Sequence, residues 1–226
     1  VNRAVEAAYA AQPAWERLPA VERGAYLHKI ADGIRARADE LTATIVAEGG
    51  KTRDLARIEV MFTADYLDYQ AEWARRYEGE ILQSDRPREN IFLFKRPLGV
   101  IAGILPWNFP FFLIARKMGP ALVTGNTIVV KPSSFTPINC QIFSEIVDGV
   151  GLPAGVFNVV NGDNQTGSHL AGHPKVAMVS LTGSVRAGQE VMATAAPNIT
   201  KVSLELGGKA PAIVLKDADL DLAVKS

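Results

Sequence analysis

The chain contains 226 residues, of which 48% are hydrophobic and 8% aromatic, with 24 basic side chains, 24 acidic side chains and one cysteine. This composition is typical of a globular protein and excludes disordered, collagen-like and disulfide-rich proteins. A net charge of zero provides no general attraction to nucleic acid or to a membrane, so we expect neither as a partner. A single cysteine cannot form an internal disulfide, which fits a reducing compartment, and we expect a cytoplasmic protein.

Residues 1–80 are expected to form a helical section. Apolar side chains recur at spacings of three and four residues in segments 7–18, 23–50 and 52–79, as they do in amphipathic helices. Glycines at the ends of the last two segments are suited to terminate them. Residues 1–90 also hold 13 basic and 16 acidic side chains, against 11 and 8 in the rest of the chain, which indicates solvated helix faces.

Residues 81–97 are expected to form a β-hairpin arm. Two extended stretches flank a polar, proline-containing turn that runs from Asp85 to Asn90. Extended stretches on either side of such a turn are typical of a hairpin.

Residues 98–226 change to short apolar strands separated by helices. The predicted strands are GVIAGIL, TIVVK, GVFNVV, VAMVSL, VSLEL and AIVL, and the predicted helices span residues 111–124, 137–150, 166–171 and 187–195. Such alternation is typical of a parallel sheet covered on both faces. We therefore expect an α/β fold, a doubly wound, Rossmann-like parallel sheet preceded by the helical section and the hairpin arm.

The longest uncharged run, residues 97–115, is long enough to suggest a membrane span. Pro106, Asn108 and Pro110 interrupt it, so a continuous spanning helix is not expected. A strand, a turn and the start of a helix fit the same residues better.

Polar residues end or follow most of the predicted strands. Because ligands bind at the carboxyl ends of the strands in such sheets, these residues are candidates for a shared crevice that takes a phosphorylated ligand. They are Trp107 and Asn108, Lys131 to Ser134, Asn161 and Gly162, Thr182 to Ser184, and Glu205.

Each candidate also has a structural interpretation. The loop 183–188 could hold a pyrophosphate on backbone N–H groups, or its serine could simply cap the next helix. Lys131 could contact a ribose or phosphate, or pair with a carboxylate. Glu205, within an apolar strand, could be catalytic or an ion-pair partner, and Asn108 could donate to an oxyanion or only form a turn.

The histidines and the cysteine provide no metal site. His28 falls on a helix, His169 and His173 flank a loop, and no ligand spacing links them. Cys140 lies in a predicted helix, where a buried and unreactive thiol is expected.

Both ends of the sequence indicate a piece of a longer protein. Val1 begins the chain inside a helical pattern, and a helix that starts at Asp217 or Asp219 would soon reach the last residue.

Five further segments occur in order along the chain: ILPWNFP at 104–110, GPALVTGNTIVVKPS at 119–133, LPAGVFNVVNG at 152–162, LTGSVRAG at 181–188 and LELGGKAP at 204–211. Taken together, they resemble one family, the NAD(P)-dependent aldehyde dehydrogenases. The N-terminal helices and the stretch FTADYLDYQAEWARRYEGEILQSD also resemble members that act on lactaldehyde or glycolaldehyde, so the resemblance covers essentially the whole chain.

The resemblance implies an enzyme that oxidises a small aldehyde to a carboxylate with NAD or NADP. In this family a cysteine thiolate attacks the aldehyde, hydride passes to the nicotinamide, and water hydrolyses the thioester. Asn108 matches the side-chain donor to the oxyanion, and Glu205 matches the general base that activates water.

The resemblance also implies a cofactor site and an assembly. Lys131 matches a contact to the adenosine ribose and Ser184 a contact to the pyrophosphate. Residues 1–226 would form a cofactor-binding domain, with the hairpin arm 81–97 used in a homodimer or homotetramer. The implied cofactor-binding residues are Leu105, Pro106, Trp107, Asn108, Lys131, Ser133, Ser134, Gly167, Gly183, Ser184 and Leu206.

Three features depart from the family pattern. The nucleophilic cysteine would follow the last residue, in a catalytic domain absent from this chain, so we expect no turnover from the chain alone. Ser134 stands where many NAD-preferring members have a glutamate, so NADP should be accepted at least as well as by those members. Asn164 replaces a common glycine, which leaves the contacts to the pyrophosphate open.

Two other functions remain alternatives. One is a non-catalytic nucleotide-binding fragment, and the other is a related acyl-phosphate reductase, which would not require Glu205. Without a catalytic domain, the isolated chain would expose the apolar surface that such a domain normally covers, so we expect it to be poorly soluble or to self-associate.

Overall fold

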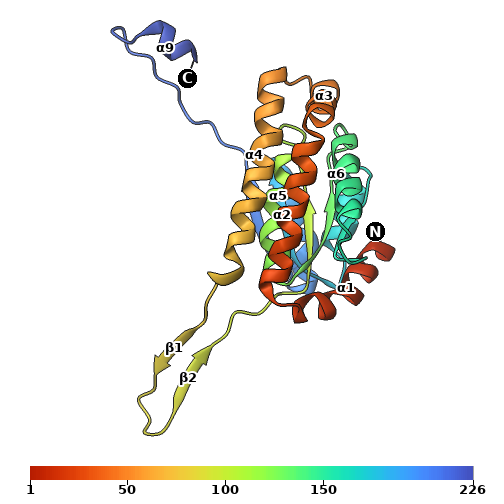
Figure 1. The fold of residues 1–226 in the computed structure, drawn as a ribbon. Coiled ribbons are helices and arrows are strands. Elements are labelled where there is room, and N and C mark those ends of the chain that lie inside the picture. The colour runs from red at the N-terminus through yellow and green to blue at the C-terminus, as the bar shows by residue number, and fades with distance from the viewer. Residues whose placement is uncertain (226) are drawn as a thin grey trace.

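The computed structural model describes residues 1–225 and contains a five-stranded parallel sheet in the order β5-β4-β3-β6-β7 (Figure 1). The chain builds one half of the sheet outward from β3 and then crosses back to add β6 and β7 on the other side. The strand order therefore reverses between β3 and β6, which confirms the doubly wound fold. The strands are β3 (Val100–Ile104), β4 (Thr127–Lys131), β5 (Phe157–Val159), β6 (Val176–Gly183) and β7 (Lys201–Leu206).

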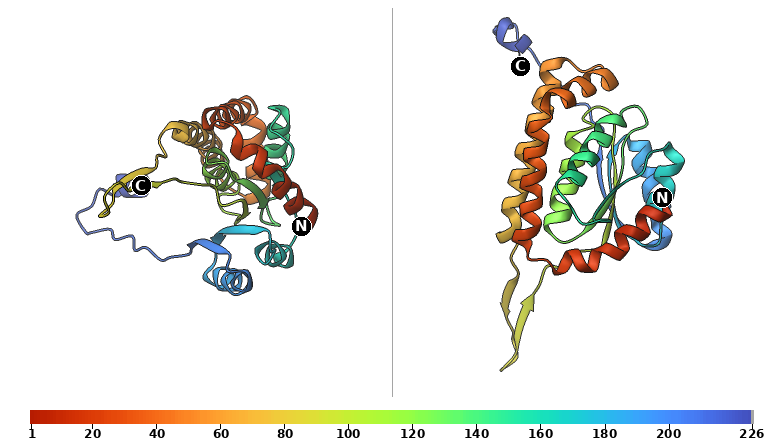
Figure 2. Two further views of the ribbon diagram at one scale, coloured as in Figure 1. Left: turned by 90° about the horizontal axis from the view of Figure 1, so that it is seen from below. Right: turned by 45° about the vertical axis from the view of Figure 1, so that its right-hand side comes forward.

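Helices cover both faces of this sheet, and Figure 2 shows the sheet between a larger and a smaller helical layer. The larger layer contains α2 (Ala20–Ala36), α3 (Ala38–Gly49), α4 (Arg53–Ala71), α5 (Phe112–Val123) and α6 (Ile138–Gly149). The smaller layer contains α7 (Asn164–Ala171), α8 (Val185–Ala195) and part of α1 (Asn2–Arg17). Two short 3₁₀ helices, η1 (Glu72–Arg75) and η2 (Ala196–Asn198), follow α4 and α8.

Helix α4 buries one face because its apolar side chains recur at helical spacing. Ala56, Val60, Ala64 and Leu67 are fully buried and face the core. The alanines keep this face narrow, so that α4 packs closely against both α2 and α5. The first four helices therefore belong to the same core as the sheet.

The hairpin is present as expected, with β1 (Glu80–Gln83) paired antiparallel to β2 (Asn90–Leu93). It projects from the body of the molecule (Figure 1). Its apolar side chains are exposed, and Ile81 and Phe94 are each more than three-quarters accessible to solvent.

The prediction of a strand at AIVL, residues 212–215, is wrong. Residues 207–216 have no helix or strand, run away from the sheet (Figure 1), and expose Ile213, Val214 and Leu215. A strand needs a hydrogen-bonding neighbour, and within residues 1–225 β7 pairs with β6 alone. The predicted helix start at Asp219 is confirmed, because its carboxylate accepts from Leu222 N at 3.1 Å ahead of α9 (Leu220–Lys225).

Two other helices start earlier than the sequence pattern predicted. Asp163 caps α7 by accepting from the backbone N–H groups of Gln165 and Thr166, and Ser184 caps α8. Polar capping residues begin a helix before its apolar pattern becomes visible. Among residues 1–225, no helix is both long enough and apolar enough to cross a membrane.

The aromatic cluster around Phe143 yields a test of the core. Phe143 is fully buried, with ring centroids 5.6 Å from both Phe111 and Phe157. Phe143→Ala should lower the free energy of unfolding by about 3–5 kcal/mol in denaturant titrations, because the site cannot collapse around the lost ring. Phe135→Ala, at a side chain that is 75% exposed, should change it by less than about 0.5 kcal/mol.

Candidate functional site

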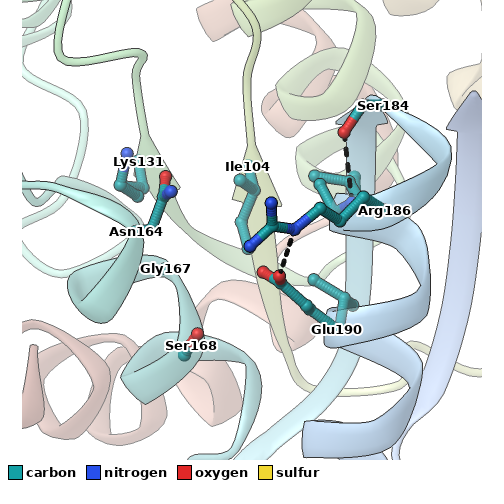
Figure 3. Close-up of a pocket in the computed structure, with 11 residues that line it drawn as sticks. Ile104, Lys131, Asn164, Gly167, Ser168, Ser184, Arg186 and Glu190 are labelled. Carbon is teal, nitrogen blue, oxygen red and sulfur yellow. Dashed lines mark hydrogen bonds and ion pairs between the residues drawn. The ribbon is translucent and has the colours of Figure 1, made fainter. Parts of the chain in front are cut away.

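Two hollows open at the carboxyl ends of the central strands. The first, which we name the α7–α8 crevice, has a volume of about 310 Å³ and lies between these helices above β3, β4 and β6. Figure 3 shows Lys131, Asn164, Gly167 and Ser168 on one side and Ser184, Arg186 and Glu190 on the other, with Ile104 between them. The crevice therefore brings together Lys131, Gly167 and Ser184, three of the candidate cofactor-binding residues.

Lys131 ends β4 and is only 5% exposed. Its Nζ donates to the backbone oxygen of Pro132 at 3.0 Å, and among the described residues no carboxylate lies within ion-pair distance of it. Burial lowers the pKa of Lys131, and the charge of Asp163 partly offsets this effect. The structural interpretation of Lys131 as an ion-pair partner is therefore wrong here, and the ammonium retains donors for a ligand.

Gly167 makes room for this lysine. A Cβ built on Gly167 would lie 3.5 Å from the Cδ of Lys131, which is van der Waals contact, so a side chain longer than that of alanine would press on the lysine stem and narrow the crevice. Asn164 lines the crevice at the start of α7.

Ser184 accepts from Ala187 N at 3.1 Å and so caps α8, directly after Gly183 ends β6. The capping interpretation of loop 183–188 is thus confirmed. Two residues in the first turn of this helix, Arg186 and Ala187, also line the crevice, so an anion bound there would lie beside a helix N-terminus. Gly188 makes room for the Leu206 side chain against this helix, because a Cβ there would lie 2.8 Å from Leu206 Cδ2.

Asn108 and Glu205 line a second hollow of about 320 Å³, which we name the α5–β7 pocket. Aromatic and aliphatic side chains form one wall, and Asn108, Arg116, Thr182 and Glu205 supply polar groups. The apolar lining residues are Phe62, Phe109, Phe112 and Leu113.

Asn108 is exposed, and its Oδ1 accepts from Phe109 N at 3.1 Å. This contact leaves both protons of the Nδ2 group available to a ligand in the pocket. Glu205 approaches Arg116 at 3.5 Å, with both side chains about half exposed. Such a long, solvated contact is weak, so the carboxylate remains able to act on a ligand.

Several candidates line neither hollow. Leu105 is buried and donates its backbone N–H to Lys131 O at 3.0 Å, whereas Trp107 is 58% exposed. Pro106 and Trp107 continue from β3 to Asn108, and Ser133 and Ser134 lie in the loop after β4. Gly183 and Leu206, the last residues of β6 and β7, border Ser184 and Glu205.

Lys117, a buried titratable side chain near Glu205, was not predicted from the sequence as a candidate site residue. It is 7% exposed on α5, and its Nζ donates to Ser180 Oγ at 2.9 Å and to Thr182 Oγ1 at 3.0 Å. Burial, assisted by Arg116, lowers the pKa of Lys117 to about 8, while Glu205 opposes the shift. The sequence pattern that indicates its burial is its spacing of four residues from both Leu113 and Ala121, which places it on the apolar face of the helix.

Cys140 is fully buried in α6, and burial raises the pKa of its thiol to about 12, so it is inert as a nucleophile. No cluster of three or more histidine, cysteine or acidic side chains suited to a metal occurs among residues 1–225.

The lowered pKa of Lys117 predicts a pH dependence of stability. The native state releases this proton near pH 8, whereas the unfolded chain holds it to about pH 10.5, so the unfolded state binds more protons between these values. The free energy of unfolding contributed by Lys117 should therefore rise with pH across this window. Urea titrations should show that Lys117→Met removes the rise and that Lys95→Met, at an exposed position, retains it. Identical pH profiles for the two variants would contradict the shift.

Comparison with known proteins shows extensive similarity over the whole chain. The model of the aldehyde dehydrogenase family matches residues 1–226. The chain is 70% identical over 226 residues to lactaldehyde dehydrogenase of Escherichia coli, covering all of this chain and 47% of that protein. It is 46% identical over 223 residues to 3,6-anhydro-alpha-L-galactose dehydrogenase of a Vibrio species, covering 98% of this chain and 46% of that protein.

Solved structures show the same relationship. The structure of lactaldehyde dehydrogenase from E. coli matches with a TM-score of 0.96 at 70% identity, over 99% of this chain and 47% of that chain. A structure of 3,6-anhydro-L-galactose dehydrogenase in complex with NAP matches with a TM-score of 0.94 at 44% identity, over the same shares. The chain thus spans about half the length of the curated relatives that it matches.

Proposed function

Because the chain belongs to the aldehyde dehydrogenase family, we propose that it is the cofactor-binding part of an enzyme that oxidises an aldehyde to a carboxylate with NAD or NADP. The observation that carries this proposal is the pairing of the two hollows at one sheet edge. The α7–α8 crevice holds Lys131 and Ser184, and the α5–β7 pocket holds Asn108 and Glu205. Residues 1–80, 81–97 and 98–226 would form its helical section, its assembly arm and its Rossmann-like core.

The crevice has groups that suit a dinucleotide. The Lys131 ammonium can reach ribose hydroxyls, and the capped N-terminus of α8 offers N–H groups to a pyrophosphate. Leu105, Pro106 and Trp107 connect the crevice to Asn108, and Leu206 adjoins Glu205, so these residues would flank the nicotinamide. When bound, the nicotinamide accepts the hydride that leaves the substrate.

The chain's own residues would act in two steps, the addition of a thiolate to the aldehyde and the hydrolysis of the thioester. The Nδ2 group of Asn108 would donate to the oxygen that becomes negatively charged when a thiolate adds to the aldehyde carbon. The Glu205 carboxylate would accept a proton from the water that hydrolyses the thioester. The nucleophilic cysteine would come from outside these 226 residues, since Cys140 is buried and protonated.

The proposed substrate is a small hydroxyaldehyde such as lactaldehyde or glycolaldehyde. Support comes from the 70% identity to lactaldehyde dehydrogenase and from the modest size of the α5–β7 pocket. Its apolar wall with polar groups at Asn108, Arg116 and Glu205 suits a short carbon chain with oxygen substituents.

The hairpin arm is proposed to take part in a homo-oligomer. Its two strands project from the body, and Ile81, Phe92 and Phe94 are more than half exposed. A projecting, exposed apolar surface of this kind is typical of an interface between subunits.

The serine at position 134 predicts the cofactor preference. Without a carboxylate at this position to repel a 2′-phosphate, NADP should bind with an affinity within about tenfold of that of NAD. Ser134→Glu should lower the affinity for NADP by at least about tenfold, because the new carboxylate would repel the 2′-phosphate. Ser84→Glu, in the hairpin, adds the same charge elsewhere and should change neither affinity. Calorimetric titration checks this, and NAD binding that is more than tenfold tighter than NADP binding in the unaltered chain would contradict it.

The activity is tested with the full-length product of the gene, after its coding sequence has been read downstream of residue 226. That product should reduce NAD or NADP in the presence of lactaldehyde or glycolaldehyde. Asn108→Ala should lower kcat/KM about 10²–10³-fold, and Glu205→Gln should lower turnover about 10²–10⁴-fold while a burst of reduced cofactor remains. Nucleotide binding without oxidation of any aldehyde would favour the alternative, a non-catalytic nucleotide-binding protein.

A further inference from the structure

A buried carboxylate outside both hollows contacts the segment that carries Asn108. Glu59 lies on α4 and is 1% exposed. Its Oε1 accepts from Phe111 N at 2.9 Å and from Phe112 N at 3.1 Å, and its Oε2 pairs with Lys51 Nζ at 2.6 Å. One carboxylate thus satisfies two backbone donors at the start of α5.

Helix α5 depends on this carboxylate because it lacks a cap from its own sequence. Its N-cap residue is Phe111, which provides no side-chain hydrogen bond to the helix. The first N–H groups of a helix need acceptors, and a negative charge at this end also interacts favourably with the helix dipole. Glu59 provides both functions from a neighbouring helix.

Lys51, the ion-pair partner of Glu59, contacts the residue that follows Asn108. Its Nζ lies 3.8 Å from the centroid of the Phe109 ring, which is the distance of a cation–π contact. Together, Glu59 and Lys51 therefore hold Phe109, Phe111 and Phe112, which immediately follow Asn108 in the chain. Asn108 is exposed, and among the described residues its side chain makes a single hydrogen bond, to Phe109 N.

We propose that Glu59, together with Lys51, is a positioning residue that fixes the direction of the Asn108 amide in the α5–β7 pocket. This role rests on the proposed function of Asn108 as the oxyanion donor. Helix α5 also carries Leu113 and Arg116 of the same pocket, so the cap holds these two side chains in place as well. A loss of the cap would move the donor without removing any group that touches the substrate.

The chain provides a matched control in Glu48. This residue lies on α3 and caps α6 from outside, with an Oε2 that accepts from Asn139 N at 3.0 Å. Both glutamates thus link the helical section to the start of a core helix. However, α6 contributes no residue to the α5–β7 pocket.

The test compares Glu59→Leu, Glu59→Gln and Glu48→Gln in the full-length gene product. Glu59→Leu removes the acceptor, and kcat/KM for the aldehyde per folded site should fall about 100-fold, as expected when a catalytic group moves by about 1 Å. Glu59→Gln keeps an acceptor and loses the charge, so a fall of about 3–10-fold is expected. If Glu59→Leu does not fold, Glu59→Gln decides the outcome.

Three accompanying measurements distinguish positioning from a general loss of structure. The cofactor dissociation constant should stay within about twofold in every variant, and Glu48→Gln should keep kcat/KM within about twofold. Amide hydrogen exchange should increase at residues 108, 109 and 111–113 for the Glu59 variants alone. Folded Glu59 variants with unchanged kcat/KM, or an equal fall in Glu48→Gln, would overturn the role.

The unaltered protein separates this inference from the proposed function. If it oxidises aldehydes and the Glu59 variants do so equally well, the positioning role is wrong and the proposed function remains. If the unaltered protein oxidises no aldehyde, the proposed function is wrong, and Glu59 is then only a helix cap.

Discussion

The rest of the structure depends on the complete burial of the central strands. Every residue of β3 and β4 is buried, because helices cover the sheet on both faces. Polar side chains cannot be accommodated along such strands without partners, so they are restricted to the strand ends. This constraint places Lys131 at the carboxyl end of β4, at the sheet edge where Ser184 follows β6 and Glu205 lies near the end of β7.

The helical N-terminal section then stabilises the element on which the pocket is built. Glu59 contacts the N-terminal end of α5, while the Arg23 guanidinium, 4% exposed, donates to Val123 O at 3.0 Å at its other end. A carboxylate at the positive end and a guanidinium at the negative end both complement the helix dipole. Helix α5 is thus fixed at both ends by residues 1–80, which explains why a section that lines little of the two hollows still matters to their geometry.

The sequence predicted most helices and strands of the fold, but not which segments would lie beside one another. The doubly wound sheet, the hairpin and most helices follow from periodicity and turn chemistry. The pattern did not show that segment 23–50 divides into α2 and α3, or that helical structure ends at Arg75 before Gly79. The strand predicted at 212–215 is absent because β-structure depends on a neighbouring strand, and an apolar pattern carries no information about one. The early starts of α7 and α8 were missed because their capping residues lie outside the apolar pattern.

For the site, the sequence by itself determined which residues stand at strand ends, since that depends only on local pattern and the rule for parallel sheets. Lys131 and Ser184 meet in one crevice, and Asn108 meets Glu205 in another, as that rule leads one to expect. Only the tertiary structure decided that Lys131 has no carboxylate partner, that Lys117 is buried beside Ser180 and Thr182, and that Glu59 caps α5. These properties depend on contacts between distant segments, because burial and electrostatic environment arise from packing and not from the local order of residues.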